Sequence, residues 1–143
     1  MFNTITFKKL AVFGFAFKKN TTDTRESAAI TLINSFVNER AYVHVYDPKV
    51  QAPQIESDML TVISKPQFDK HVKVFTSAYE AAEDADAVII LTEWDEFKTL
   101  DYASIFKSMR KPAYIFDGRL ILDVGKLQDI GFNVEVIGTQ GRF

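Results

Sequence analysis

The chain has 143 residues, of which 47% are apolar and 25% charged, an ordinary composition for one globular domain with a hydrophobic core. The formal net charge of −2 argues against long-range attraction to nucleic acid or an anionic membrane, and no run approaches the ~20 apolar residues that span a bilayer. The absence of cysteine excludes disulfides, zinc–thiolate sites and thiol nucleophiles from this sequence. We therefore expect a single domain over residues 1–143, with no nucleic-acid or membrane partner. Because its first residues lack the features of a signal peptide, we expect a cytoplasmic protein.

Short apolar segments rich in β-branched and aromatic residues recur along the chain and predict six strands. In chain order these segments are Leu10 to Gly14, Tyr42 to Tyr46, Val72 to Phe75, Ala87 to Thr92, Ala113 to Phe116 and Val134 to Ile137. The segment from Ala87 to Leu91 is apolar on both faces, which is typical of a central parallel strand covered by helices on each side.

Helical patterns lie between these strands. The clearest runs from Arg25 to Glu39, and shorter ones cover Ser77 to Glu83, Tyr102 to Met109 and Asp123 to Ile130. Residues 51–71 contain two prolines and predict a short helix or an irregular excursion. Strands that alternate with helices indicate βαβ units, so we expect an α/β fold: a Rossmann-like, doubly wound, mostly parallel sheet of about six strands with helices on both faces.

The segment "GFAFKKNTTDTRES" follows the first strand, at the carboxyl edge where such sheets bind ligands. Only Gly14 of the three glycines of a dinucleotide fingerprint is present, so direct docking of a pyrophosphate on the next helix is disfavoured. Lys18 could instead offer its charge to a phosphate, and an exposed aromatic its face to a base or sugar. From spacing alone a plainer interpretation is favoured, with solvated lysines and with Phe13, Phe15 and Phe17 continuing the strand.

A second polar cluster, "IFDGR", follows the fifth strand. Asp117 and Gly118 form a natural turn, and Arg119 would emerge at the same edge as Lys18, so that the two cations indicate an anion. The alternative is an ion pair between Arg119 and a nearby acid such as Asp117 or Asp123.

A third cluster, "TEWDEF", leaves the central strand at this edge. Trp94 could cover a pocket or wedge the loop against the core, the more common role of a loop tryptophan. Asp47 stands where dinucleotide folds place a ribose-binding acid, although a strand-ending turn before Pro48 is equally consistent. His44 and His71 have no partner at metal-ligand spacing, and no nucleophile is paired with a base. We expect no metal site, no catalytic residue and no bond chemistry by this chain alone.

Four motifs, "GFAFKKNTTDTRES", "YDPKV", "LTEWDEFK" and "FDGR", occur in this order. As a set they resemble the carboxyl-terminal, UDP-binding domain of the UDP-glucose/GDP-mannose dehydrogenase family, from about Lys8 onward. Residues 1–8 would then be a linker or tail remnant. The members that oxidise UDP-glucose, the UDP-glucose 6-dehydrogenases, look nearer than those acting on UDP-N-acetylmannosamine or GDP-mannose.

The resemblance implies an NAD-dependent oxidoreductase that oxidises the sugar 6-hydroxyl of UDP-glucose twice, through a cysteine thioester, to give UDP-glucuronate. It also implies an amino-terminal NAD-binding domain, a central domain that carries the catalytic cysteine, and a homo-oligomer. By matching the motifs, Phe17, Lys18 and Arg119 would contact UDP or UDP-glucose, and Arg25 would reach the NAD pyrophosphate. With no cysteine, the chain cannot form the thioester, so we expect an excised or truncated domain that is inactive alone.

Two departures from the family stand in the first loop, where Asn20 often is Asp and Thr22 often is Gly. They leave the expected contact residues in place but predict a different loop backbone. Two alternatives stay open, a non-catalytic Rossmann-like interaction module and the same domain from a dehydrogenase acting on another nucleotide sugar.

Overall fold

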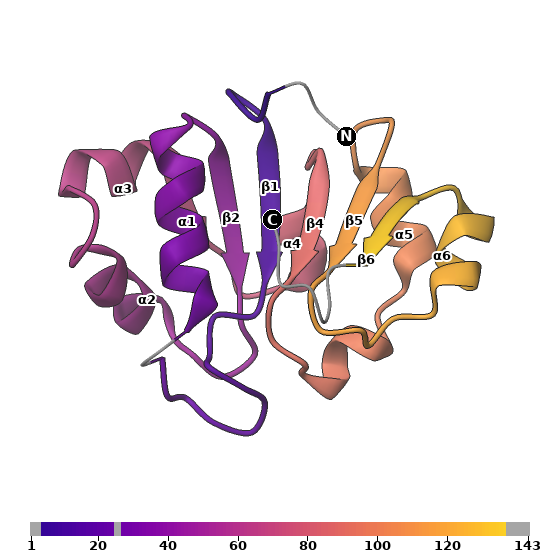
Figure 1. The fold of residues 1–143 in the computed structure, drawn as a ribbon, viewed down its shortest axis with the longest axis horizontal. Helices are drawn as coiled ribbons and strands as arrows, with labels where there is room; N and C mark the ends of the chain where they lie inside the picture. The colour runs from indigo at the N-terminus through magenta and orange to yellow at the C-terminus, as the bar shows by residue number, and fades with distance from the viewer. Residues whose placement is uncertain (1–3, 25–26, 137–143) are drawn as a thin grey trace.

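Six short strands form one parallel sheet in the computed structural model, which describes residues 4–24 and 27–136 (Figure 1). All neighbouring strands pair in parallel, in the order β3-β2-β1-β4-β5-β6. The strands are β1 (Lys9–Phe13), β2 (Tyr42–Tyr46), β3 (Val72–Val74), β4 (Ala87–Ile90), β5 (Tyr114–Asp117) and β6 (Asn133–Val136).

The strand order reverses between β1 and β4. The chain first moves outward from β1 to β2 and β3, then crosses back to place β4 on the other side of β1. In doubly wound sheets such a reversal opens a crevice outside the carboxyl ends of the two strands, because their loops leave in opposite directions. These ends lie at the lower edge of the sheet in Figure 1.

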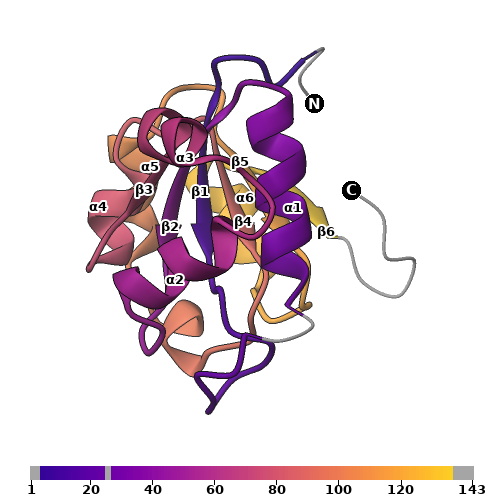
Figure 2. The ribbon, with the colours of Figure 1, turned by 90° about the vertical axis from the view of Figure 1, so that its left-hand side faces the viewer.

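Helices cover the sheet on both sides. They are α1 (Ala28–Asn38), α2 (Ala52–Met59), α3 (Lys65–His71), α4 (Ala78–Ala82), α5 (Tyr102–Ser108) and α6 (Val124–Ile130), with a 3₁₀ turn η1 (Asp95–Lys98). Figure 2 shows α1 on one side of the sheet and α4 and α5 on the other. Every helix in the described residues is too short or too polar to cross a membrane.

The hydrophobic core is continuous across the sheet and is densest around β4. All four residues of β4 are buried, which confirms its prediction as a central strand. On one face α1 buries Ile33 and Phe36, and on the other the ring of Phe13 stacks on Phe97 with centroids 5.3 Å apart. Burial of this many large apolar side chains is the main stabilising contribution to such a fold.

The predicted fold class is confirmed, and the predicted strands lie within two residues of the observed ones. Residues 51–71 were predicted to form a short helix or an irregular excursion, and they form two helices, α2 and α3. Pro53 and Pro66 each lie in the first turn of a helix, where the missing N–H is not needed. The prolines therefore begin these helices rather than interrupt them.

The first strand ends at Phe13 because Gly14 turns the chain with a φ of +102°. Phe13 and Phe15 are fully buried while Phe17 is 41% exposed, so the prediction that the three continue one strand is wrong. A side chain on Gly14 would put its Cβ 2.7 Å from the backbone nitrogen of Thr92 and still nearer the Thr92 hydroxyl. Glycine thus permits the close approach of the β1 and β4 loops.

We expect Gly14→Ala to lower the free energy of unfolding by roughly 1–3 kcal/mol, from backbone strain and the clash with Thr92. Urea denaturation measures the change. Gly125→Ala is the control, because its Cβ would lie 3.6 Å from the nearest atom, within α6, where alanine adds up to about 1 kcal/mol. Equal effects of the two substitutions would contradict this account of the turn.

Candidate functional site

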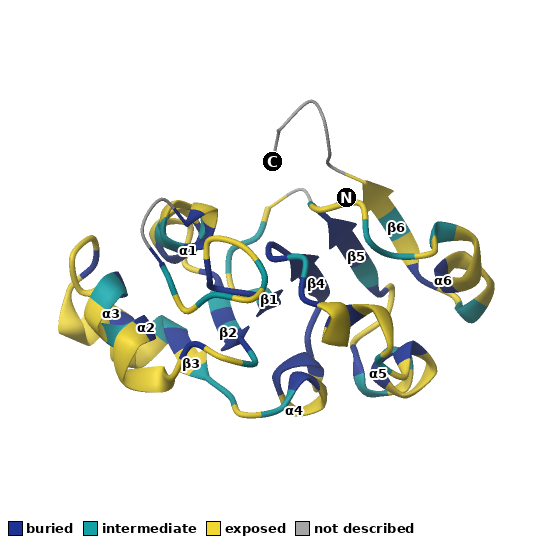
Figure 3. Cartoon of the chain, turned by 90° about the horizontal axis from the view of Figure 1, so that it is seen from below, coloured by how far each residue is buried: buried dark blue, intermediate teal, exposed yellow. Residues whose placement is uncertain are grey.

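The loops that follow β1, β4 and β5 meet at the carboxyl edge of the sheet. These three strands are neighbours in the order β1-β4-β5, so their loops leave the sheet side by side. Figure 3 looks onto this edge, where the loop after β1 has buried ends and an exposed tip that contains Phe17 and Lys18.

Three consecutive residues after β4 hold the β1 loop. The Thr92 hydroxyl donates to the carbonyl of Ala16 at 2.8 Å, and the Trp94 indole N–H donates to Asp47 Oδ2 at 3.1 Å. Between them, Glu93 accepts a hydrogen bond from the backbone N–H of Lys19 at 2.9 Å. Trp94 is only 6% exposed, so of its two predicted roles the wedge against the core is confirmed.

Asp47 at the end of β2 is an internal acceptor and not a free ribose-binding acid. Its Oδ2 accepts from the backbone N–H groups of Phe15 and Ala16 at 2.7 and 3.0 Å, in addition to the indole of Trp94. Its Oδ1 accepts from Lys49 and Val50 at 2.8 and 2.9 Å, which closes the turn at Pro48. Five donors fill the lone pairs of this 7%-exposed carboxylate, so the strand-ending turn is the correct alternative.

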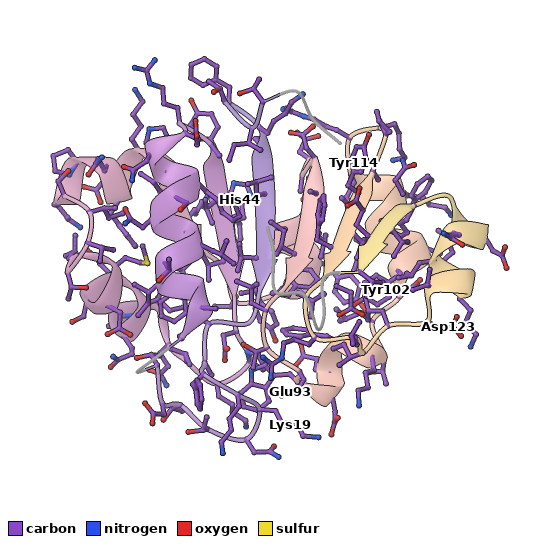
Figure 4. The ribbon with its side chains drawn as sticks, in the orientation of Figure 1. Lys19, His44, Glu93, Tyr102, Tyr114 and Asp123 are labelled. Carbon is purple, nitrogen blue, oxygen red and sulfur yellow. The ribbon has the colours of Figure 1, made fainter. Side chains whose placement is uncertain are left out.

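Glu93 joins the β1 loop to the turn after β5. While its Oε1 accepts from Lys19, its Oε2 accepts from Arg119 Nη2 at 2.6 Å. Burial raises the pKa of Glu93, but the hydrogen bonds from Arg119 and Lys19 outweigh it and hold the pKa below its ordinary value. Glu93 therefore stays ionised near neutral pH, beside Lys19 in Figure 4.

Phe17 and Lys18 lie at the exposed tip of the β1 loop. The backbone N–H of Phe17 donates to the Asp23 carbonyl at 2.7 Å, which closes the loop on itself. Lys18 is exposed and makes no ion pair within the described part of the chain, whereas the ammonium of Lys19 lies 3.6 Å from Asp95. The charge of Lys18 is thus uncompensated by a direct partner.

Arg119 lies at the same edge, two residues beyond β5. The prediction of an ion pair for Arg119 named the wrong partner. The guanidinium pairs with Glu93 and not with Asp117 or Asp123. Asp117 accepts instead from the backbone N–H groups of Arg119, Ile121 and Leu122 at 2.8–3.0 Å, which fixes the turn. The Arg119 side chain keeps 39% of its surface exposed, so part of the guanidinium faces solvent.

The remaining predicted positions contribute less to this edge. Arg25 lies outside the described residues. No group of acids and histidines in residues 4–24 and 27–136 could hold a metal ion, and burial lowers the pKa of His44, whose Nδ1 faces the Ala81 carbonyl. Asn20 adopts a φ of +64°, which asparagine tolerates, whereas Thr22 needs no positive φ.

A hollow of about 360 Å³ lies beside the β1 loop. It is lined by Thr22, Lys49, Val50, Gln51, Pro53 and Gln54. None of Phe17, Lys18 and Arg119 lines it, so it is not the place where these three side chains would meet a ligand.

Sequence reasoning did not single out Glu93. Its place three residues after β4 gave no signal by itself, because only the strand order shows that β4 lies between the two strands whose loops carry the predicted cations. The role of Asp47 was open for a different reason, since donors from three separate segments converge on it only in the fold.

We expect Asp47→Asn to lower the free energy of unfolding by roughly 2–4 kcal/mol, because an amide nitrogen facing two or more N–H donors leaves them unsatisfied. Trp94 is the single tryptophan of the chain, so its emission maximum should change as its hydrogen bond to residue 47 weakens. Urea titrations and emission spectra measure both effects. Asp129→Asn, at an exposed site on α6, should change neither, and a stable Asp47→Asn variant with native emission would refute the acceptor role.

The lowered pKa of Glu93 predicts a pH dependence of stability. A carboxyl with a folded-state pKa below its unfolded value, 4.5, stabilises the fold above that value and loses this contribution as pH falls through the folded-state pKa. The stability lost in Glu93→Gln should therefore be constant from about pH 7 to about pH 5.5 and shrink as the pH falls below 4.5 through the folded-state pKa. Urea unfolding at several pH values tests this, with the exposed Glu135→Gln as control. A Glu93→Gln deficit that does not shrink as the pH falls below 4.5 would exclude the electrostatic explanation.

The chain matches known proteins over almost its whole length. Residues 11–124 match the model of the UDP-glucose/GDP-mannose dehydrogenase family, UDP binding domain. The UDP-glucose 6-dehydrogenase of Caenorhabditis elegans is 52% identical over 97% of this chain, and that of Drosophila melanogaster 50% identical over 98%. This chain covers 29% and 30% of those two proteins.

The fold has the same relatives. The UDP-D-ManNAc dehydrogenase of Pyrococcus horikoshii superposes with a TM-score of 0.69 at 30% identity, over 94% of this chain and 26% of that one. The agreement of family model, sequence relatives and structure leads to one conclusion. The chain belongs to the UDP-glucose/GDP-mannose dehydrogenase family and corresponds to its UDP-binding domain.

Proposed function

We propose that this domain binds the UDP part of a nucleotide sugar at the carboxyl edge, with Lys18 and Arg119 on the diphosphate and Phe17 against the base or sugar. The observation that carries the proposal is the bridge through Glu93, which holds the Arg119 turn against the loop that bears Lys18. Two cations on adjoining loops match the charge of a diphosphate, and Lys18 has no ion pair with any described residue that a ligand would have to break.

The guanidinium of Arg119 can serve both Glu93 and a ligand. It has five N–H donors in a planar fork, and only Nη2 contacts Glu93. The side chain is partly exposed, so its other donors could reach a phosphate without breaking the ion pair. Phe17, at 41% exposure, offers an apolar surface beside the same lysine.

We infer that the chain acts as part of an NAD-dependent UDP-glucose 6-dehydrogenase, which oxidises UDP-glucose to UDP-glucuronate with two NAD. It spans about 30% of the curated relatives that carry this name, and the rest of such an enzyme would supply an NAD-binding domain, a central domain and the contacts of a homo-oligomer. The preference for UDP-glucose rests on curated relatives named UDP-glucose 6-dehydrogenase at about 50% identity. With no cysteine, the chain alone would be inactive.

The described residues do not form a cradle for NAD itself. Gly14 is closed against Thr92, and the Ser27 hydroxyl accepts the N–H of Ala29 in the first turn of α1 at 3.1 Å and donates to the Phe15 carbonyl. The close approach of Thr92 to Gly14 and the cap at Ala29 both disfavour a pyrophosphate docked on this turn. NAD would be held by another domain. We propose that Arg25 reaches toward the pyrophosphate of that NAD.

We expect UDP to bind the chain by itself with a dissociation constant near 1 mM, about −4 kcal/mol, because the chain spans only about 30% of its relatives and would lack the contacts that the rest of such an enzyme supplies. Lys18→Ala should weaken binding roughly tenfold, since one charge-assisted contact to phosphate is lost. Chemical shift changes of the backbone amides during a UDP titration measure both constants. Lys107→Ala is the control, because this exposed lysine lies in the last turn of α5, after which the chain runs to the start of β5 at the opposite edge of the sheet.

In a complete dehydrogenase that carries this domain, Lys18→Ala should raise the KM for UDP-glucose by a similar factor. An unchanged KM together with unchanged UDP binding would refute the site. The interaction-module hypothesis makes the opposite prediction, namely self-association or partner binding that ignores UDP, and sedimentation of the chain with and without UDP distinguishes the two.

A further inference from the structure

We propose that Glu93 is a positioning residue for the anion site, and that its carboxylate sets the spacing between Arg119 and the loop that carries Lys18. This inference rests on the proposed function and names a residue that does not itself need to touch the ligand. Its role would be to hold two cationic groups, one from each neighbouring loop, at a separation that a diphosphate can span.

The geometry allows few other residues to do this. β4 lies between β1 and β5, so a side chain directly after β4 can reach both loops at once. Glu93 uses one oxygen for each loop, 2.9 Å to the Lys19 backbone N–H and 2.6 Å to Arg119 Nη2. Lys19 is the immediate neighbour of Lys18, so the first bond fixes the backbone beside the exposed Lys18.

The β1 loop has a stem, the residues up to Ala16, and a tip around Phe17 to Lys19. Glu93 is not needed to keep the stem in place. The stem is fastened at Ala16, whose carbonyl accepts from Thr92 and whose N–H donates to Asp47. The bond from Lys19 to Glu93 lies three residues farther out, toward the tip. Loss of the Glu93 carboxylate should therefore loosen the tip and the Arg119 side chain while the stem and the sheet keep their structure.

A purely electrostatic role and a positioning role of Glu93 predict opposite changes in UDP affinity when its carboxylate is removed. A carboxylate beside an anion site repels the ligand, so removal of its charge should tighten UDP binding if charge alone mattered. If Glu93 holds Arg119 and the loop in place, its removal should weaken binding, because the ligand must then order both groups. The sign of the change separates the two accounts.

The experiment compares UDP titrations of the native chain, Glu93→Gln and the control Asp95→Asn, followed by amide chemical shifts. Asp95 is a matched neighbouring acid that contacts Lys19 Nζ at 3.6 Å and Lys98 at 3.3 Å but does not touch Arg119. We expect Glu93→Gln to weaken binding about five- to twentyfold and to shift the Lys19 amide in the free protein, and Asp95→Asn to leave affinity unchanged or slightly higher.

A double-mutant cycle adds a readout that general destabilisation would not reproduce. Once Arg119→Ala has removed the guanidinium, Glu93→Gln should weaken UDP binding by less than twofold, because part of what it positions is gone. Equal losses of UDP affinity with and without Arg119, or a Glu93→Gln variant that binds UDP as tightly as native, would overturn the positioning role.

If the native domain gives no response to UDP and Lys18→Ala leaves the KM of the complete enzyme unchanged, the proposed function fails and the role of Glu93 fails with it. A normal native response with an unaffected Glu93→Gln variant overturns the role of Glu93 alone.

Discussion

The buried carboxylate of Asp47 is the interaction on which the arrangement of the carboxyl edge depends. It accepts hydrogen bonds from β1-loop backbone, from the turn after β2 and from the indole that follows β4. These donors come from three separate segments of the chain. Without Asp47 they would be buried with no acceptor, which costs free energy of folding. Because one acid satisfies all of them, the β1 loop leaves the strand in a fixed direction, and its tip reaches the region where Arg119 emerges.

An acid that accepts backbone N–H groups of a loop is found after or at the end of three strands. Asp47, Glu93 and Asp117 follow or end β2, β4 and β5, and each accepts at least one backbone N–H from a loop that departs from the sheet. Acids are not expected at an edge for which anion binding is proposed. Their lone pairs are taken by internal donors, and Glu93 in addition neutralises part of Arg119, so the fold uses these charges to organise loops.

The sequence predicted the sheet because the strands are short, apolar and separated by clear helical patterns, and β4 was recognised as central because both of its faces are apolar. It predicted less well where an outcome depends on contacts distant along the chain. Asp47 had two plausible roles until Phe15 and Trp94 were seen to converge on it, 32 and 47 positions away. Arg119 was expected to pair with a local acid, whereas its partner is Glu93, 26 positions away and brought near only by the pairing of β4 with β5.

Glu93 escaped prediction because nothing in its local sequence distinguishes it from the neighbouring acids Asp95 and Glu96. Asp95 makes ion pairs with Lys19 and Lys98, and Glu96 accepts from the Tyr46 hydroxyl at 2.5 Å, so the three acids in these four positions have different sets of partners. Only the first lies where the β1 and β5 loops are both within reach. Its importance is therefore a property of the strand order, and no local pattern could have revealed it.

A fastened stem with an exposed tip suits a domain that holds a ligand but does no chemistry on it. The contacts of Thr92 and Asp47 order the loop before any ligand arrives, which lowers the entropy lost on binding. Phe17 and Lys18 lie beyond these contacts and remain accessible to a ligand that approaches from outside the sheet. A loop ordered along its whole length by internal bonds would bury the groups that must meet the ligand, and one without the stem contacts would have to be ordered by the ligand itself. The division of the loop at Ala16 and Lys19 gives this edge both order and access, which is the physical reason to expect its affinity to depend on Glu93 as much as on the cations themselves.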